Sequence, residues 1–439
     1  MSSKHPISLR DVFVPGGLPK YTYQKRNYVD QQGDTVDIEL ELIKTLRRVN
    51  KFIAVAGPTK SGKTVLVRSC LNKGIDNIWI EGGHFDKIEE IWEAVLEDLG
   101  HPSSYTETSA HQDESSGFVD TTGGIRPGGI GAEVKVQKAT KSVKNEGRSE
   151  TYKKTGAKAA IEALVAARKV LVIDDFHYLP EGVQTKLIRA LKPAVFNGLQ
   201  VILLVIPHRM HQAAQAEIDV DGRTATIKIP DWQEKELFSI AESGFNILKV
   251  TCVPSIIDQL VKEALASPHL MQDFCSKLCE ENEVYGEQAS PKEIFLKPPV
   301  SQFFEKLASG IAPNAFEALR KGPERTNRIE RDLLNGGKCD TYEAIMLALK
   351  ETGAETPINW TGLRKALQSI LSDVPQQHEI TRALEKMDEI AKLASGEPII
   401  DYMKKQGDLH LVDPFFRFYL KWNNSLTEQT KAKGATQKS

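Results

Sequence analysis

Five short apolar runs alternate along the first half of the chain with stretches of helical periodicity. The runs are FIAVA (52–56), DNIWI (76–80), KVLVIDD (169–175), QVILLVI (200–206) and TATIKI (224–229). Apolar residues of 85–99 and of AKAAIEALVAARK (157–169) recur at the three- and four-residue spacing of amphipathic helices. Strands that are apolar on both faces and alternate with helices are typical of a parallel sheet covered on both sides. The pattern therefore predicts an α/β core with a parallel five-stranded sheet over residues 51–230.

Residues 101–150 interrupt this alternation. The segment is rich in Gly, Ser, Thr and Lys and has few large apolar side chains, so it predicts a mobile insertion that buries little surface. Two alternatives stay open. GGIRPGG (123–129) and the lysines after it could bind a partner or nucleic acid, and EVKVQK (133–138) could form a short hairpin.

Beyond residue 230 the pattern becomes mainly helical. Amphipathic helices over 231–285 predict a small lid, and the stretch 286–310, with GEQASPKE and LKPP, predicts a linker. Residues 311–425 are helical until PIIDYM and LHLV, which flank KKQGD as a hairpin with Gly at the turn. Helices followed by a hairpin suggest a winged-helix-like domain, and the tail 426–439 is expected to be disordered.

Composition narrows the class of protein. The chain has 439 residues and a formal net charge of −2, which suits two or three domains and gives no overall attraction to nucleic acid. Its five cysteines are scattered, which indicates reduced thiols and a cytoplasmic protein. Cys275 and Cys279 could face one metal ion, but no second Cys/His pair has ligand spacing, so a buried helix face is favoured. We expect neither a signal peptide nor a membrane span, because no apolar run is long enough.

Residues 57–64 read GPTKSGKT and fit the P-loop pattern G-x-x-x-x-G-K-[ST], with FIAVA before them and the helical TVLVRSCL after them. In such a loop, backbone N–H groups and a helix N-terminus converge on phosphate oxygens. Lys63 is expected to reach the β- and γ-phosphates, and Thr64 to hold Mg²⁺. The predicted phosphate-binding residues are Gly57, Pro58, Thr59, Lys60, Ser61, Gly62, Lys63, Thr64 and Val65.

A second motif, VLVIDDFHYL (170–179), has two carboxylates at the end of an apolar run. An acid in this position suits a Walker B motif, because its carboxylate meets the water shell of Mg²⁺ beside the P-loop. Asp174 takes that role as a metal ligand with Thr64. Asp175 is then placed to orient or deprotonate the attacking water. The alternative is that one aspartate only caps the following helix.

GPTKSGKT, LVIDDFHYL and VILLVIPHR together resemble the STAND branch of P-loop ATPases and its AAA+ and archaeal-type relatives. The resemblance implies an ASCE/AAA+-like core, a helical lid, bound Mg-ATP and self-association. It also implies that Arg209, in PHR, senses the γ-phosphate, and that Arg223 acts as an arginine finger in a neighbouring subunit's site. The alternative for each arginine is an ordinary surface ion pair. The chain departs from the AAA+ pattern, which prefers a small polar residue at the Arg209 position and a glutamate after Asp174.

The same resemblance suggests residues around the base. In ASPHL (266–270), Pro268 and His269 stand where relatives often have a Gly-x-Pro turn, but the glycine is missing. A helix start with Ser267 as N-cap and Pro268 in the first turn explains the same letters. The N-terminal segment 1–50 is expected to pack on the nucleotide site, with Tyr21, Tyr23 and Arg26 near adenine. Core packing is the alternative for the two tyrosines.

The ending LHLVDPFFRFYLKW (409–422) resembles winged-helix modules of archaeal-type ATPases, and Arg417 with Lys421 could form part of a basic face. The resulting hypothesis is a slow, ATP-hydrolysing switch. Its nucleotide state would control self-assembly and engagement of a protein partner or DNA, in bacterial defence, transposition or regulation. Two alternatives remain: a non-hydrolysing, ATP-bound adaptor for DNA or protein, and a P-loop phosphotransferase.

Overall fold

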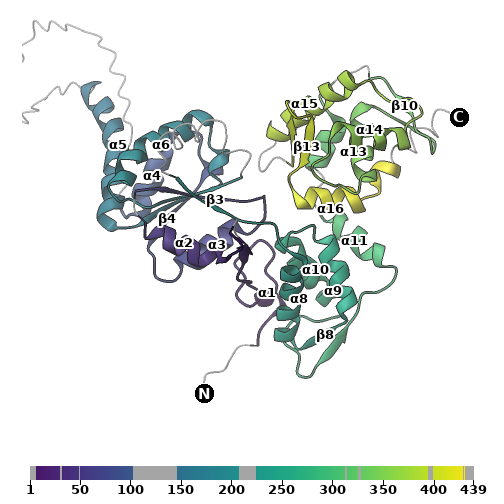
Figure 1. Cartoon of the computed structure of the whole chain (residues 1–439), viewed down its shortest axis with the longest axis horizontal. Helices are drawn as coiled ribbons and strands as arrows, with labels where there is room; N and C mark the ends of the chain where they lie inside the picture. The colour runs from purple at the N-terminus through teal and green to yellow at the C-terminus, as the bar shows by residue number, and fades with distance from the viewer. Residues whose placement is uncertain are drawn as a thin grey trace, which may run out of the picture.

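The computed structural model describes residues 6–29, 32–48, 50–101, 146–206, 224–311, 314–324, 328–393, 399–428 and 430, with 146–155 as backbone only. These residues form an α/β core, a helical lid and a C-terminal helical domain (Figure 1). The α/β core and the C-terminal domain both adjoin the lid.

The core is a five-stranded parallel sheet in the order β4-β5-β6-β3-β7. Its strands are β3 (Phe52–Ala56), β4 (Asn77–Glu81), β5 (Val170–Asp174), β6 (Val201–Val205) and β7 (Thr224–Lys228). Every residue of β3, β5 and β6 is buried, which explains why these strands read as continuous apolar runs. The predicted α/β fold class with five parallel strands is confirmed.

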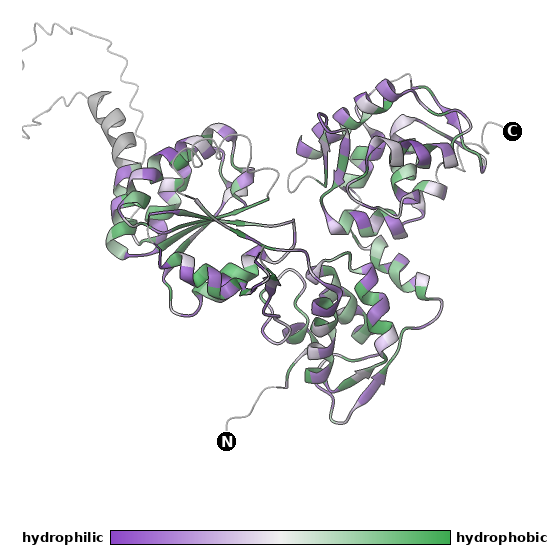
Figure 2. Cartoon of the chain, in the orientation of Figure 1, coloured by the Kyte–Doolittle hydropathy of each residue, from purple (hydrophilic) through white to green (hydrophobic). Residues whose placement is uncertain are grey.

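Helices cover both faces of the sheet. On one face lie α2 (Ile38–Leu46) and α3 (Lys63–Leu71), and on the other lie α4 (Ile88–Asp98), α5 (Glu146–Ala167) and α6 (Glu181–Phe196). Alternate side chains of β3 join the two layers: Phe52 packs with α4–α6, and Ile53 packs with α2 and α3. The inner strands of the sheet are mainly hydrophobic, whereas the helices contain both hydrophobic and hydrophilic residues (Figure 2). Helix α5 begins inside the segment predicted as an insertion, of which 102–145 lies outside the described residues.

The N-terminal segment runs along the lid before it reaches the core. Its elements are α1 (Leu9–Val12) and the hairpin of β1 (Asn27–Val29) and β2 (Thr35–Asp37). After α1, Phe13 packs edge-on against Phe245 of the lid with ring centroids 5.5 Å apart. Gly244, beside that ring, has no space for a side chain, since a Cβ atom there would lie 2.3 Å from Phe13.

The lid extends further along the chain than the sequence indicated. It contains α8 (Glu234–Leu248), β8 (Val250–Cys252), α9 (Pro254–Glu263), α10 (Pro268–Glu281), β9 (Lys292–Ile294) and α11 (Val300–Ser309). Residues 286–310 are therefore not a free linker: β9 pairs with β8, and Phe303 and Phe304 enter the lid core. Cys275 and Cys279 are fully buried in that core, and burial raises the pKa of both thiols, as the prediction of a buried helix face requires.

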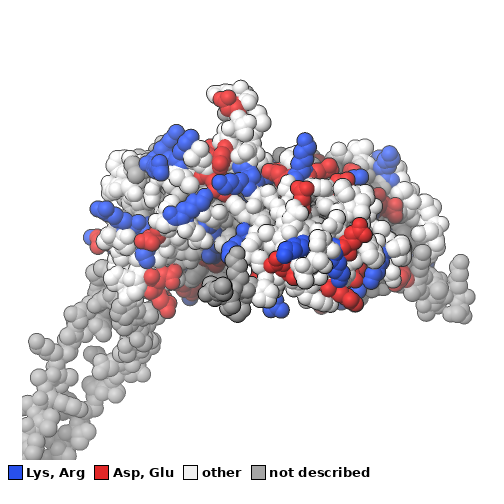
Figure 3. Space-filling view, turned by 90° about the horizontal axis from the view of Figure 1, so that it is seen from below, with Lys and Arg blue, Asp and Glu red and all other residues white. Residues whose placement is uncertain are grey.

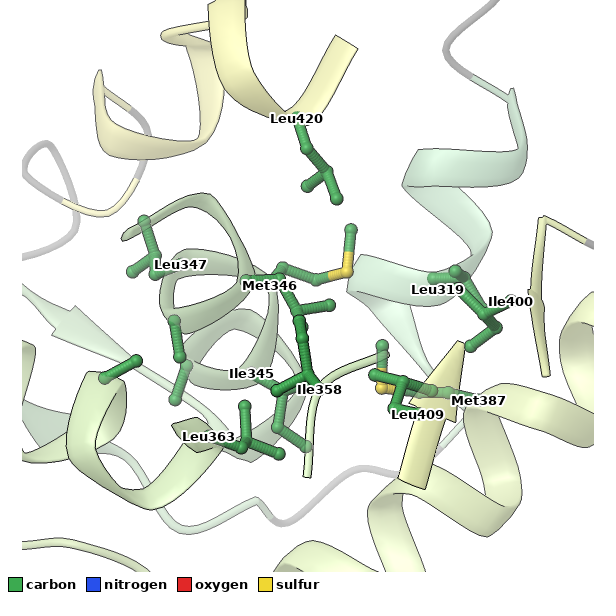
Figure 4. Packing of buried hydrophobic residues seen from close by; sticks show 14 of the residues in the cluster. Leu319, Ile345, Met346, Leu347, Ile358, Leu363, Met387, Ile400, Leu409 and Leu420 are labelled. Atoms are coloured by element: carbon green, nitrogen blue, oxygen red, sulfur yellow. The ribbon is translucent and has the colours of Figure 1, made fainter. Parts of the chain in front are cut away.

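The C-terminal domain has its own hydrophobic core. It comprises α12 (Asn314–Lys321), β10 (Arg331–Asp332), β11 (Lys338–Cys339), α13 (Thr341–Glu351), α14 (Trp360–Ile370), α15 (Gln377–Leu393), β12 (Ile400–Met403), β13 (Asp408–Leu411) and α16 (Pro414–Trp422). The predicted hairpin is confirmed: β12 and β13 are antiparallel, and Gly407 has a φ of 75° in the turn. Ile358, between α13 and α14, bridges to Leu409 of the hairpin. Both point into the core with Met346 and Leu363 (Figure 4).

Helix α16 joins the C-terminal domain to the lid. Phe418 packs against Phe274 of the lid with ring centroids 5.0 Å apart, and Tyr419 packs against Phe316 of the C-terminal domain at 4.8 Å. Lys421 pairs with Glu263 of the lid at 2.8 Å. Because the helix is covered in this way, the prediction of a basic face with Arg417 and Lys421 is wrong. Basic and acidic side chains are interspersed on the face drawn in Figure 3. Among the described residues, no helix has the length and hydrophobicity to span a membrane.

Candidate nucleotide-binding site

The loop between β3 and α3 is shaped by its glycines. Gly62 precedes α3 with a φ of 89°, a left-handed conformation that glycine adopts without steric cost. At Gly57, a Cβ atom would lie 2.8 Å from Ile229 and 3.0 Å from the hydroxyl of Ser61. Both fixed glycines of the motif are therefore required by the geometry of the loop.

Lys63 folds back across this loop. Its Nζ donates to the carbonyl oxygens of Gly57 at 3.1 Å and Pro58 at 2.7 Å, and the side chain is buried. These two bonds hold an ammonium group over the N-terminus of α3. That this ammonium group faces phosphate oxygens stays a prediction of the motif.

Thr64 and Asp174 come together although 110 residues separate them. Thr64 Oγ1 donates to Asp174 Oδ2 at 2.8 Å, and the backbone N–H of Asp175 donates to Asp174 Oδ1 at 3.0 Å. Asp174 is only 2% exposed, and burial raises the pKa of its carboxyl. A hydroxyl and a carboxylate are hard oxygen donors of the kind that Mg²⁺ takes beside phosphates. The residues therefore fit the predicted ion.

Asp175 begins the 3₁₀ turn η2 (Phe176–Tyr178) in a left-handed conformation, with a φ of 49°. Its side chain makes no capping hydrogen bond to that turn, so the alternative of a helix cap does not account for it. Asp175 instead lines a cavity together with the P-loop. Gly82, in the 3₁₀ turn η1 (Gly82–His84), lies so close that a Cβ atom there would be 2.6 Å from the Asp175 carbonyl oxygen.

This cavity, of about 230 Å³, brings most of the predicted site residues together. It is formed by the N-terminal segment, the P-loop and the lid. Its predicted members are Tyr23, Arg26, Lys60, Ser61, Gly62, Lys63, Thr64, Val65, Asp175, Pro268 and His269. Apolar side chains such as Val14 and Ile240 also line it.

Tyr23 and Arg26 make polar contacts within the protein. Tyr23 donates to Glu39 at 2.7 Å, and burial raises the pKa of its hydroxyl. Arg26 donates to the carbonyl oxygens of Pro230 and Asp231, and its guanidinium lies 4.3 Å from the Trp232 ring centre. Both residues thus line the pocket and also join the N-terminal segment to the rest of the protein.

Trp232 is a site residue that the sequence analysis did not identify. Its indole N–H donates to the carbonyl oxygen of Ser61 at 2.8 Å, so the first residues of the lid are fastened to the P-loop. Arg26 covers the same ring. The sequence around Trp232 does not indicate this contact, because Ser61 lies 171 residues away.

Pro268 and His269 stand at the start of α10. Ser267 accepts a hydrogen bond from the backbone N–H of Leu270 at 3.3 Å, so the helix-start interpretation is confirmed. Ala266, where relatives often have glycine, adopts a φ of 57°, which glycine favours. The His269 ring meets Phe415 edge-on with centroids 4.7 Å apart, and burial lowers the pKa of this histidine to about 4.

The C-terminal domain reaches the P-loop through Lys60. The Lys60 ammonium forms an ion pair with Asp413 and lies 4.2 Å from the Phe415 ring centre. Asp413 also caps α16, accepting from the N–H groups of Phe415 and Phe416. The start of α16 therefore touches both the P-loop and, through Phe415, the lid.

Arg209 and Arg223, the predicted γ-phosphate sensor and arginine finger, lie outside the described residues. Their roles remain predictions. Among the described residues, no cluster of three or more His, Cys, Asp or Glu side chains could hold a metal ion by itself. A magnesium site here would therefore depend on phosphate oxygens as well as on Thr64 and Asp174.

Residues 46–212 match the family model described as an AAA domain. A comparison with curated protein sequences found no match. Among solved structures, the chain is similar to Cdc6p from Pyrobaculum aerophilum, with 12% identity and a TM-score of 0.42 over 97% of this chain and 100% of that one. It is also similar to ORC2 of Aeropyrum pernix, with 13% identity and a TM-score of 0.46 over 92% of each chain. Similarities of this size say nothing about activity or partners.

Proposed function

We propose that this chain, whose residues 46–212 match the AAA domain family model, binds Mg-ATP, hydrolyses it slowly, and uses the nucleotide state to set the position of its C-terminal domain. The observation that carries the proposal is the contact of Thr64 with Asp174 at the mouth of the loop that Lys63 crosses. P-loop hydrolases place side chains of these three types around a magnesium-bound triphosphate.

Each residue has a separate task in this proposal. Backbone N–H groups of the loop and the Lys63 ammonium would hold the β- and γ-phosphates, while Thr64 and Asp174 would hold the ion. The ion would supply charge neutralisation at the phosphate oxygens. Asp175 orients the attacking water and accepts its proton. Tyr23, Arg26 and Pro268 shape the wall of the pocket that encloses the base.

The C-terminal domain is the proposed output. Its order of helix, bridging residue, helix, helix and hairpin supports a winged-helix-like module. On α15, Lys386 pairs with Glu389 and Lys392 pairs with Asp388, so acidic and basic groups alternate on this helix. We propose that the module engages a partner and that self-assembly follows the nucleotide state. If the partner is DNA, binding falls steeply with salt.

Turnover tests the proposal on the full chain. We expect Lys63→Ala to abolish nucleotide binding, and Asp175→Asn to keep binding but stop phosphate release. Asp258→Asn, an exposed substitution on α9, is the matched control and should behave as wild type. Equal hydrolysis by wild type and Asp175→Asn would remove the assigned base.

The same assay separates the alternatives. A non-hydrolysing adaptor would bind ATP with no phosphate release from the wild type. A phosphotransferase would place the labelled γ-phosphate on an acceptor. The absence of affinity for any nucleoside triphosphate would refute the proposed function as a whole.

A further inference from the structure

A second cavity, of about 400 Å³, lies between the P-loop, the lid and the C-terminal domain. Thr59 and Ser61 line it from the P-loop, Asp231 and Trp232 from the start of the lid, and His410 and Arg417 from the C-terminal domain. Ser61 and Trp232 also line the nucleotide cavity. The two cavities are therefore neighbours around one short stretch of the loop.

The loop side of this cavity carries two hydroxyls without partners. Thr59 is 4% exposed and Ser61 is 5% exposed. Among the described residues, neither hydroxyl oxygen has a hydrogen-bond partner, and both atoms are buried. Buried polar groups are nearly always hydrogen-bonded, so two unpartnered hydroxyls on residues that line a cavity point to a ligand with acceptor oxygens.

The opposite side carries a cation with unused donors. Arg417 donates one hydrogen bond, from Nε to the carbonyl oxygen of Ala354 at 2.8 Å. Its Nη1 and Nη2 groups make no hydrogen bond within the described part of the chain. The side chain is half-buried, and burial lowers its pKa, although Asp231 acts in the opposite direction. A guanidinium with two free NH2 groups matches the oxygens of a phosphate.

Contacts at the start of α16 fix the position of this arginine. Asp413, one helical turn before it, is paired with Lys60 of the P-loop, and the Arg417 backbone N–H donates to the Asp413 carbonyl oxygen at 3.1 Å. Phe415 packs against both Lys60 and His269. The arginine is therefore held beside the loop by α16 itself.

We infer that this cavity binds a phosphoryl group, with Arg417 and the hydroxyls of Thr59 and Ser61 as its donors. The group is either the γ-phosphate of ATP held on the P-loop or the inorganic phosphate that hydrolysis releases. The inference rests on the proposed function and adds to it that the C-terminal domain contacts the phosphate directly. With ATP bound, the P-loop and α16 would contact the same phosphoryl group, whereas with ADP alone they would not.

The test compares affinities for a non-hydrolysable ATP analogue, for ADP, and for ADP with inorganic phosphate. We expect Arg417→Gln to weaken binding of the analogue about tenfold or more while ADP binding stays as in wild type, because charged hydrogen bonds are lost only with the triphosphate. If inorganic phosphate is the ligand, it should instead tighten ADP binding in wild type and not in the variant. Lys421→Gln, on the same helix but paired with the lid, is the matched control.

Thr59→Val provides a second variant that does not disturb α16. Removing an unpartnered buried hydroxyl should leave the free protein as stable as wild type or more stable, yet weaken binding of the analogue or of phosphate. A purely structural role for the threonine would not produce this combination. The inference would be overturned if both variants kept the wild-type ratio of analogue affinity to ADP affinity and phosphate had no effect on ADP binding. The proposed function would survive that result. Failure of wild type to bind any nucleotide would remove the proposed function and the inference together.

Discussion

Replacing Asp413 with asparagine separates two contacts that this one side chain makes. Its carboxylate pairs with Lys60 of the P-loop, and it also accepts from the backbone N–H groups of Phe415 at 2.6 Å and Phe416 at 3.0 Å. Asparagine is as good an N-cap as aspartate, so Asp413→Asn keeps the cap and removes the charge. Asp413→Ala removes both.

The expected magnitude follows from the exposure of the pair. The Lys60 side chain is 30% exposed and that of Asp413 is 8% exposed. This places the pair between a surface ion pair, which contributes up to about 1 kcal/mol, and a buried pair, whose disruption costs about 3–5 kcal/mol. We expect Asp413→Asn to weaken docking of the C-terminal domain on the P-loop by about 1–2 kcal/mol. Asp413→Ala should cost about 1 kcal/mol more, from the lost cap.

Amide hydrogen exchange measures this effect locally. Faster exchange is expected in residues 57–64 and 413–419 of Asp413→Asn, with little change in the lid core. Asp373→Asn, an exposed substitution elsewhere in the same domain, is the control. A double-mutant cycle with Lys60→Gln should return a coupling of about 1–2 kcal/mol, since each variant removes the same pair.

Two results would refute this reasoning. Exchange in 57–64 that matches wild type would mean that the pair does not hold the C-terminal domain on the P-loop. Equal stability of Asp413→Asn and Asp413→Ala would mean that the capping bonds contribute nothing to α16.

Two further predictions concern the lid. Burial lowers the pKa of His269 to about 4, so between that pH and its usual 6.5 the unfolded chain binds the proton more readily and stability must rise with pH. The shift corresponds to about 3 kcal/mol at most, reduced to about 1–2 kcal/mol because the ring is partly exposed. The free energy of unfolding, measured with urea, should therefore change less between pH 7 and 4.5 for His269→Gln than for wild type. An equal change in both proteins would contradict the lowered pKa of His269. Gly244→Ala should destabilise the lid by about 1–3 kcal/mol through its clash with Phe13. Thermal unfolding checks this, and Phe13→Leu should restore part of the loss.

The core and its phosphate loop could be predicted because their signals are local. The three inner strands β3, β5 and β6 are buried on both faces, so each reads as an apolar run whatever surrounds it. Gly57, Gly62 and Lys63 likewise lie in one short loop, so their spacing in the sequence is enough to identify it. The pairing of Thr64 with Asp174 followed from the chemistry of the two motifs, not from any pattern between them.

The contacts that join the domains could not be predicted in this way. Lys60 and Asp413 are 353 residues apart, and each has an ordinary local role, one in a loop and the other as a helix cap. Arg417 and Lys421 have the spacing of a surface pair, and only the folded structure shows that Arg417 is bonded to Ala354 of its own domain and Lys421 to Glu263 of the lid. Residues 286–310 look like a linker because β9 is three residues long and α11 begins directly after two prolines.

Helix α16 belongs to two hydrophobic cores at once, with Phe418 among the lid helices and Phe416 and Leu420 among those of the C-terminal domain. Pulling either core away from this helix would expose large apolar side chains to water, which is costly. The lid and the C-terminal domain should therefore travel as one rigid body. If this rigid body moves away from the α/β core, the chain should bend at residues 230–232, which connect β7 to α8. The hydrogen bonds of Arg26 and Trp232 lie at this hinge.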